Sequence, residues 1–599
     1  MSEYRPPLDD INFTLNYVAE LPSVAKLNGF QHIDADTTSG ILTEAGRFFS
    51  EVMAPLNRIG DEQGSILEDG SVRTPDGFQE AYAKYVEAGW GGAHIPEEHG
   101  GGGLPYTVGI VIQEMFKTAN MSFSLCPLLT QAAIEALIQH GTDSQRATYL
   151  EKLVTGEWAG TMCLTEPQAG SDVGALTTKA VRQDDGTYRL SGTKIFITWG
   201  DQDLTDNIIH LVLARTPDAP PGTRGISMFI VPKFLVGTDG SPGERNDIKI
   251  VSLEHKLGIH ASPTCVVSFG DSGEGAVGYL IGEEEAGMRN MFTMMNTARI
   301  GVGVEGLAIS EAAYQKAAAY TLERKQGREV GAPATESSLL VRHPDVRRML
   351  MTMRAYREAL RCLLYVTARQ VDNERHAETA EMRQAAAEMV ALLTPVTKAW
   401  PTDIGVEMAS LGIQVHGGMG FIEETGAAQF YRDARIAPIY EGTNGIQAID
   451  LVTRKLPMAG GEVIERLVSE IRRVAEKLSD DDGLSRFGLH LEDGAEAIEE
   501  ASESLLARLG EKPNDALAGA TPFLRLLGTV IGGWLMGKSA LAASRLLANG
   551  EGDADFLEAK LATARFYGEQ ILPSAMGLIE AVVADSELLF AIEDEAMAG

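Results

Sequence analysis

The sequence predicts an α+β protein of several domains: helices, then a small β domain, a helical bundle and a further helical domain. The chain has 599 residues, and a chain of this length divides into several hydrophobic cores. Short β-type runs fill residues 160–283, whereas apolar residues recur at helical spacing on both sides of that stretch. Hydrophobic residues make up 44% and charged residues 23%, which is ordinary for a folded globular protein.

Residues 35–159 are predicted to form the first helical domain, after an N-terminal extension of residues 1–34. ADTTSGILTEAGRFFSEVMAPLNRIGDEQG has apolar residues at helical spacing after a Thr- and Ser-rich start. TVGIVIQEMFKTANMSFSLCPLLTQAAIEALIQHG continues this pattern, and the Gly-rich loop IPEEHGGGGLP lies between the two segments.

Residues 160–283 are predicted to form a compact β-barrel or sandwich. Their β-type runs are TYRLSGTKIFIT, NIIHLVLAR, GISMFIVPK, DIKIVSL and TCVVSFG, and turn signals such as DDG, PPG and SPG separate them. Helical spacing returns over residues 284–456, where long helices with short links predict a bundle. Residues 457–599 are predicted to form an additional helical domain.

Charge and cysteine usage exclude several classes of protein. The formal net charge is -33, which argues against a nucleic-acid binder, although a local basic pocket for a small polyphosphate is still allowed. Four scattered cysteines without a C-x-x-C pair indicate reduced thiols and no zinc site. MSEYRPPLDDINFTLNYVAEL lacks the apolar core of a signal peptide, and residues 524–545 are interrupted by Gly, Lys and Arg. We therefore expect a cytoplasmic protein without a membrane span.

Three segments carry candidate chemistry, and each has an ordinary explanation when it is taken alone. MCLTEPQAGSDVGALTTKA (162–180) supplies hydroxyls and a glycine, but Ser, Gly and Asp also simply form turns. KIFITWG (194–200) places an aromatic residue at a strand end, where such a residue normally packs into the core. QVHGGMGFIEETGAAQFYRDARIAPIYEGTNGIQAIDLVTRKL (414–456) contains Glu441 just before the expected start of a helix, where a carboxylate usually caps the helix or is stabilised by its dipole.

Taken together, these segments resemble the acyl-CoA dehydrogenase family in their order and spacing. GWGGAHIPEEHGGGGLP, EHKLGIHASPT and FTMMNTARIGVG match it as well, so the resemblance covers roughly residues 60–460. It implies an N-terminal helical domain, a middle β-barrel and a four-helix bundle, with FAD between barrel and bundle. YRPPLDDINFTLN and the additional C-terminal domain resemble one bacterial branch of the family.

The resemblance implies which residues of the barrel region bind FAD. The resemblance implies that Met162, Leu164 and Thr165 line the flavin. It implies that Phe196, Ile197 and Thr198 flank the flavin ring. Thr165 is expected near the pyrimidine edge and Thr198 near N5. The family usually has Trp at position 196, so stacking by Phe196 is expected to be weaker.

Further FAD contacts are implied outside the barrel region. The resemblance assigns contacts with the FAD of a neighbouring subunit to Arg324, Gln326, Gln414, Gly417 and Gly418, and an adenine-side contact to Thr443. Contacts of this kind imply a homo-oligomer, either a dimer or a tetramer.

Glu441 matches the family's catalytic base, which removes the α-proton of an acyl-CoA while the β-hydrogen leaves as hydride to flavin N5. Some branches take the base from another helix, at the position of Ala298, which has no acid here. Ser171 matches a position between FAD and the CoA moiety, where it contacts both, and Arg299 and Gly442 match positions near the acyl-CoA substrate. The family implies an electron-transferring flavoprotein as electron acceptor.

Three alternatives remain open at this point. An acyl-CoA oxidase would pass its electrons to oxygen instead. A DNA-binding relative on the same fold would need a basic face, which the net charge of -33 disfavours. A catalytically silent CoA-binding scaffold would not need Glu441.

Overall fold

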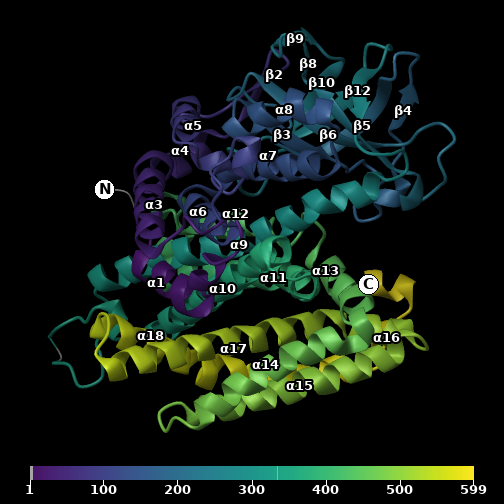
Figure 1. Cartoon of the computed structure of the whole chain (residues 1–599). Helices are drawn as coiled ribbons and strands as arrows, with labels where there is room; N and C mark the ends of the chain where they lie inside the picture. The colour runs from purple at the N-terminus through teal and green to yellow at the C-terminus, as the bar shows by residue number, and fades with distance from the viewer. Residues whose placement is uncertain (1–3, 334) are drawn as a thin grey trace. The chain divides into compact units, whose positions relative to one another are not determined.

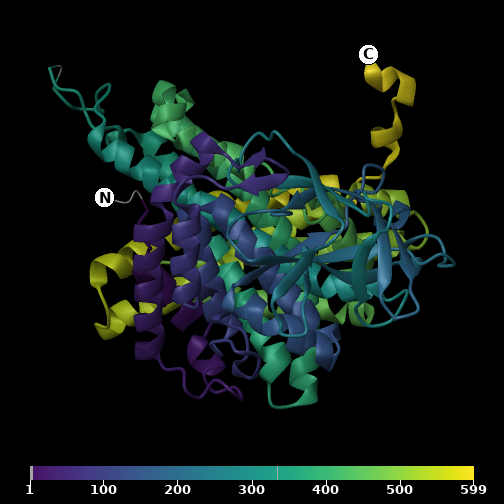
Figure 2. The same cartoon turned by 90° about the horizontal axis from the view of Figure 1, so that it is seen from above.

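The computed structural model describes residues 4–333 and 335–599, which form two compact units (Figures 1 and 2). One unit contains Thr43–Gly301 with the described part of Met1–Pro6, and the other contains Pro7–Leu42 and Val302–Gly599. Helices α3 (Ala35–Phe48) and α9 (Gly287–Glu323) each contribute residues to both units.

The first unit begins with helices, as the apolar periodicity predicts. They are α4 (Pro55–Gln63), α5 (Phe78–Glu87), α6 (Tyr106–Ala119), α7 (Met121–His140) and α8 (Asp143–Thr155).

A short hairpin interrupts these helices, which the expectation of helices alone missed. Strands β1 (Ile66–Glu68) and β2 (Ser71–Arg73) pair antiparallel across Asp69-Gly70. Both turn residues have positive φ, 50° and 79°, which is the backbone that an Asp-Gly turn supplies. The DG pair in the sequence was therefore the available signal.

The predicted β domain is one sheet with the strand order β10-β11-β5-β12-β7-β6-β3, in which β4 also pairs with β5. Strands β8 and β9 form a separate antiparallel pair, and they come between β7 and β10 in the sequence. The strands are β3 (Trp158–Cys163), β4 (Lys179–Arg182), β5 (Tyr188–Thr198), β6 (Asn207–Ala214), β7 (Ser227–Pro232), β8 (Phe234–Val236), β9 (Pro242–Arg245), β10 (Ile248–Leu253), β11 (Thr264–Phe269) and β12 (Ala276–Leu280).

Strand β5 connects two parts of this sheet. Its first half pairs with β4 and β12, and its second half pairs with β11, so that the sheet encloses a core that includes Tyr188, Phe229 and Phe269. Strand β3 pairs parallel with β6, in register from Trp158 opposite Asn207. The sheet thus fixes the end of β3, from which the segment 162–180 leaves.

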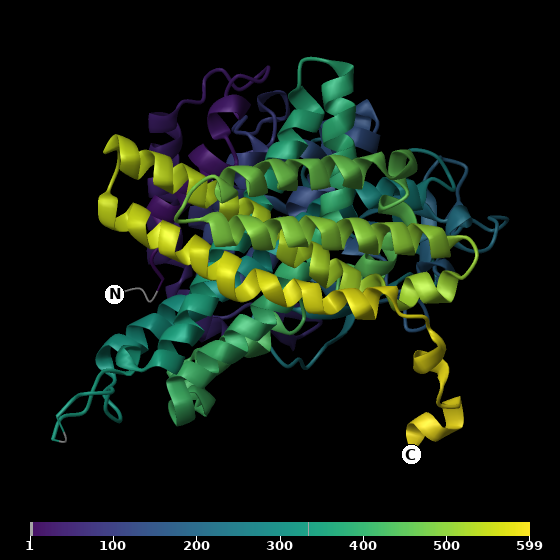
Figure 3. The ribbon, with the colours of Figure 1, turned by 90° about the horizontal axis from the view of Figure 1, so that it is seen from below.

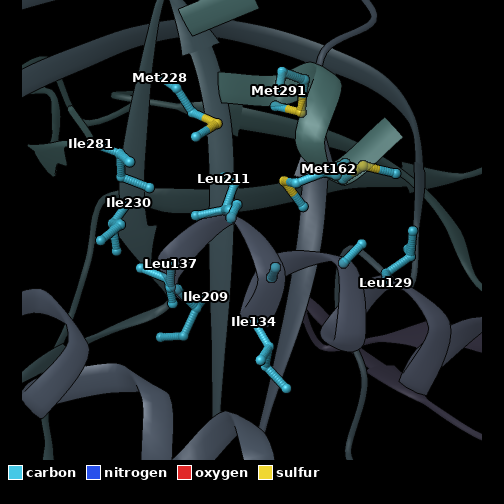
Figure 4. Close-up of a cluster of buried hydrophobic side chains, with 14 of the residues drawn as sticks. Leu129, Ile134, Leu137, Met162, Ile209, Leu211, Met228, Ile230, Ile281 and Met291 are labelled. Carbon is cyan, nitrogen blue, oxygen red and sulfur yellow. The ribbon is translucent and has the colours of Figure 1, made fainter. Parts of the chain in front are cut away.

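A second core joins helix α7 to the other face of this sheet (Figure 4). Met162 of β3 is 8% exposed and packs in the same cluster as Leu129 of α7 and Met291 of α9. Residues from β6 and β7 complete the cluster, among them Leu211 and Met228. The chain around Met162 is therefore held by packing before any ligand is considered.

The second unit is helical throughout its described elements (Figures 1 and 3). The long helices α10 and α11 pack against each other, and α17 packs against both of them as well as against α14, α15 and α18. The helices are α1 (Leu8–Phe13), α2 (Leu21–Val24), α10 (Pro344–His376), α11 (Ala380–His416), α12 (Ala427–Ala434), α13 (Asn444–Asp450), α14 (Glu462–Ser479), α15 (Ser485–Leu509), α16 (Pro513–Ala518), α17 (Ala520–Asn549), α18 (Ala554–Phe566) and α19 (Ile579–Val583).

Two glycines of α17 explain how closely this helix approaches α11. A Cβ added at Gly528 would lie 2.5 Å from Trp400, and one at Gly532 would lie 2.7 Å from the same indole ring. Trp400 is 0% exposed, and Arg525 forms a bidentate pair with Glu407 at 2.6 and 3.0 Å. The additional C-terminal helices thus cover the bundle helix α11.

The N-terminal extension reaches the same group of helices. Asp10 of α1 accepts from Lys560 of α18 at 2.6 Å and also pairs with Arg361 of α10, while Lys560 donates to Glu358 at 2.8 Å. All four side chains are buried. Burial alone would raise the pKa of Asp10, but the Lys560 and Arg361 charges outweigh it and lower that pKa.

Two helices, α7 and α17, are long and apolar enough to cross a membrane by length and composition, although residues 524–545 of α17 are interrupted by Gly, Lys and Arg. In these helices 94% and 89% of the apolar window is buried inside the protein, so their apolarity serves the core. The cysteines Cys126, Cys163, Cys265 and Cys362 are free and buried, and burial raises the pKa of each thiol to about 12.

Candidate active site

The structure brings together two of the segments that carry candidate chemistry, 162–180 and 194–200. The Ile195 N–H donates to the carbonyl of Thr165 at 2.9 Å, and Lys194 Nζ donates to the carbonyl of Leu164 at 2.9 Å. The predicted flavin-lining residues and the predicted ring-flanking residues therefore lie on adjacent, hydrogen-bonded stretches of the first unit.

A buried ion pair braces this junction. Glu166 is 2% exposed and pairs with the fully buried Lys194 at 2.8 Å. The same carboxylate accepts from the Thr177 N–H at 2.7 Å and from the Thr178 hydroxyl at 2.5 Å. Burial would raise the pKa of Glu166, but the Lys194 charge and these hydrogen bonds prevail and lower it to about 2.

Glu166→Gln is expected to destabilise the protein by about 3–5 kcal/mol, because it leaves the Lys194 ammonium buried without its partner. The pKa of Glu166 in the folded protein, about 2, lies below the ordinary value of 4.5 for a glutamate. The pair therefore contributes stability above pH 4.5, and this contribution falls away as the pH drops towards 2. Thermal unfolding between pH 4.5 and 7 measures the effect.

The matched control is the double variant Glu166→Gln/Lys194→Met. It removes the unpaired charge as well, so it should unfold at a higher temperature than Glu166→Gln alone. Equal melting temperatures for Glu166→Gln and the wild-type protein would show that the pair does not brace the junction.

Phe196 is presented to the outside of the first unit rather than packed into its core. Its backbone has φ +59°, and its side chain is 57% exposed, so the ordinary expectation of a core aromatic is wrong here. Ile197 is buried, and Trp199, at φ +52°, donates from Nε1 to the Ser122 carbonyl at 3.2 Å. Left-handed backbone is costly for such residues and often marks functional sites.

The loop after β3 is open enough to meet a ligand. Ser171 is exposed, Leu164, Thr165 and Thr198 are half-buried, and a Cβ added at Gly170 would meet no atom within 4 Å. An exposed aromatic ring beside such a loop suits a flat, polar-edged group such as a flavin.

Arg299 and Ala298 lie side by side on α9. Arg299 is 4% exposed, with its guanidinium 5.8 Å from the centre of the Phe292 ring. Ala298 is fully buried in the core cluster around Met162. The position from which some branches of the resembled family draw their base thus carries no acid and no exposed atom.

In the second unit, the loop after α9 exposes Arg324 and Gln326 while its backbone is fixed. The Leu340 N–H donates to the Arg324 carbonyl at 2.9 Å, and the Gln326 N–H donates to the Ser338 carbonyl at 3.0 Å. Both side chains are free to meet a ligand without reordering the loop.

The end of α11 is similarly open. Gln414 is exposed, Gly417 has φ +60°, and a Cβ added at either Gly417 or Gly418 would meet no atom within 4 Å. The structure therefore offers backbone at this turn for close approach by another molecule.

Glu441 stands in the second unit at a strained position shortly before helix α13. Its φ is +55° and its side chain is half-buried. The cap of α13 is Thr443, whose hydroxyl oxygen accepts from the Ile446 N–H at 3.2 Å. Thr443, and not Glu441, is therefore the N-cap residue of α13.

Asn444 ties this turn to helix α11, a role that the sequence did not reveal. Its amide nitrogen donates to Asp403 at 2.7 Å, and its amide oxygen accepts from Lys398 at 2.8 Å. Gln447 donates to the carbonyls of Glu441 and Gly442, at 3.3 Å each. Glu441 and Gly442 thus precede a firmly anchored helix.

A small cavity of about 20 Å³ lies between α6 and α7 in the first unit. Its lining includes Trp90, Gln113, Gln131 and Leu128, and Gln113 donates to Gln131 at 3.0 Å. Among the described residues, no group of three or more His, Cys, Asp or Glu side chains could hold a metal ion.

Family models identify the chain. The N-terminal, middle and C-terminal domains of acyl-CoA dehydrogenases match residues 37–157, 161–272 and 285–456. The chain belongs to the acyl-CoA dehydrogenase family. A further model, described as acetyl-CoA dehydrogenase C-terminal like, matches residues 467–593, so the additional C-terminal domain also has relatives.

Three similar proteins illustrate the match. The 3-methylmercaptopropionyl-CoA dehydrogenase of Ruegeria pomeroyi is 50% identical over 95% of this chain and 96% of its own length. Caenorhabditis elegans ACDH-11, solved in complex with C11-CoA, has a TM-score of 0.78 at 20% identity, over 99% of this chain and 96% of its own. An acyl-CoA dehydrogenase of Bacillus anthracis complexed with FAD has a TM-score of 0.73 at 22% identity, over 96% and 91%.

These similarities confirm the predicted family, fold class and FAD cofactor. The protein is an oxidoreductase that dehydrogenates an acyl-CoA. The exposed Phe196, the open loop at Gly170 and the open turn at Gly417 are compatible with FAD. The roles of individual residues, Glu441 included, stay predictions.

Proposed function

We propose that this acyl-CoA dehydrogenase uses Glu441 as the base for the α-proton of a short acyl-CoA thioester. The observation that carries this proposal is the carboxylate at a strained turn directly before α13, where Thr443 already serves as the cap. A non-glycine residue kept at φ +55°, beside a helix that Thr443 already caps, fits a functional position, because strained backbone clusters at active sites.

Each set of residues has a task in this proposal. Met162, Leu164 and Thr165, with Phe196, Ile197 and Thr198, bind and orient the flavin. When bound, FAD supplies the acceptor for the β-hydrogen, which leaves as hydride while the α-proton passes to Glu441 and the C=C double bond forms. Ser171, Arg299 and Gly442 orient the CoA ester.

The second unit contributes further FAD contacts in this proposal, through the exposed Arg324, Gln326, Gln414, Gly417 and Gly418, with Thr443 on the adenine side. We assign the first five to the FAD of a second copy, which makes the enzyme a homo-oligomer, a dimer or a tetramer. Electrons then pass to an electron-transferring flavoprotein in the cytoplasm.

For the substrate, we propose 3-methylthiopropanoyl-CoA or a fatty acyl-CoA of similar length. Support comes from the name of the Ruegeria pomeroyi relative at 50% identity. Segment 122–132, which includes the cavity-lining Leu128 and Gln131, is proposed to limit the acyl chain.

The test begins with the purified protein, which should be yellow. Anaerobic mixing with 3-methylthiopropanoyl-CoA, butyryl-CoA or palmitoyl-CoA should bleach the flavin fastest for the first two. A colourless protein that takes up no added FAD would contradict the flavin-binding assignments, and fastest bleaching by palmitoyl-CoA would overturn the short-chain substrate. Rapid reoxidation of the reduced flavin in air would identify an oxidase instead.

A further inference from the structure

The strained backbone of Glu441 needs an anchor on each side. A non-glycine residue in the left-handed region is strained, and surrounding contacts must hold it there. On the C-terminal side, Asn444 and Gln447 do so through the hydrogen bonds to α11 and to the turn carbonyls. On the N-terminal side, the anchor is a contact of Tyr440.

Tyr440, the residue directly before Glu441, is held by a buried carboxylate. Its hydroxyl donates to Glu305 Oε2 at 2.5 Å. Glu305 lies on α9 within the second unit and is 0% exposed. A hydrogen bond to a buried carboxylate is short and strong, and it is costly to break because the acceptor then loses a partner.

The proton of this hydrogen bond stays on Tyr440. Burial raises the pKa of the Tyr440 hydroxyl well above 10, and the negative charges of Glu305 and Glu441 raise it further. At neutral pH the Tyr440 hydroxyl is therefore the donor to Glu305.

We propose that Glu305 is a positioning residue, which fixes Glu441 for proton abstraction by holding the Tyr440 hydroxyl. This inference rests on the proposed role of Glu441 as base. With Tyr440 tied to α9 and Asn444 tied to α11, the Glu441 backbone between them keeps its left-handed conformation. The carboxylate is then preorganised before substrate arrives, and loss of this order lowers the rate of the chemical step.

The experiment separates proton abstraction from hydride transfer. Acetyl-CoA has α-protons but no β-carbon, so it can exchange its α-protons with D2O without reducing the flavin. NMR of acetyl-CoA in D2O with the FAD-loaded enzyme measures this exchange, and anaerobic bleaching by butyryl-CoA measures the complete reaction. FAD content and acetyl-CoA binding are checked for each variant.

Tyr440→Phe and Glu305→Leu should each slow exchange and bleaching at saturating substrate on the order of 10- to 100-fold, with little change in the half-saturating substrate concentration. Glu305→Gln, whose amide oxygen can still accept from Tyr440, should stay close to the wild-type rate. The double variant Tyr440→Phe/Glu305→Leu should be no slower than the slower single variant, because both remove the same contact.

Two results would overturn the inference. One is a wild-type rate in Tyr440→Phe, which removes a single oxygen and therefore reports even if Glu305→Leu does not fold. The other is a Glu305→Gln variant as slow as Glu305→Leu, since the hydrogen-bond acceptor would then not be what matters. If Glu441→Gln still exchanges the α-protons, the proposed base itself is wrong, which is a separate outcome.

Discussion

Glu441→Gln should abolish reduction of the flavin by acyl-CoA while FAD and the CoA ester still bind. The amide keeps the volume and the backbone N–H of the residue, but it cannot accept the α-proton. Loss of a general base typically lowers the rate on the order of 100- to 10,000-fold, and the loss here can be larger because hydride departure depends on the developing α-carbanion. Anaerobic bleaching on mixing with butyryl-CoA measures the rate.

Glu423→Gln is the matched control for this variant. Glu423 lies in the same stretch of chain, is 63% exposed and pairs with Arg432 at 2.9 Å, and exposed pairs contribute little to stability. Its bleaching rate should be close to that of the wild-type enzyme. Bleaching of Glu441→Gln at a similar rate would place the base elsewhere and remove the central assignment.

Deleting residues 462–599 should leave an insoluble protein. The deletion removes α17, whose Gly528 and Gly532 cover Trp400, and it removes Lys560, the buried partner of Asp10. Apolar faces of α10 and α11 would then be exposed to water. The buried Asp10 carboxylate would lose its Lys560 partner. Soluble yield and size-exclusion chromatography are the measurements.

A point variant tests the same contact without a truncation. Gly528→Leu places a side chain where a Cβ alone would already lie 2.5 Å from Trp400, so its melting temperature should fall clearly. Gly510→Ala serves as the control, because a Cβ there meets no atom within 4 Å. A soluble, fully active truncation would contradict the interpretation that these helices complete the fold.

Local patterns predicted most of the fold. The spacing of apolar residues shows which face of a helix or strand is buried, and it differs between the two. For this reason the predicted order of helices, sheet and helices agrees with the structure. The hairpin across Asp69-Gly70 was missed because its strands are only three residues long, too short for a period to show.

Contacts between distant residues could not be predicted in this way. The pair of Glu166 with Lys194 depends on how the loop after β3 meets β5, and the bond of Tyr440 with Glu305 joins residues 135 positions apart. A single sequence does not show which distant residues come into contact. The family resemblance supplied Glu441 and Phe196, whereas only the backbone angles show that both stand at left-handed positions.

The contact of Asp10 with Lys560 has a consequence for how the chain folds as it is made. The two residues are 550 positions apart, and ribosomes add about 5–20 residues per second, so Asp10 waits roughly half a minute to two minutes for its partner. During that time the first helix has no finished surface to join. The N-terminal segment therefore reaches its final packing late, because helix α18, which carries Lys560, is synthesised near the end of translation.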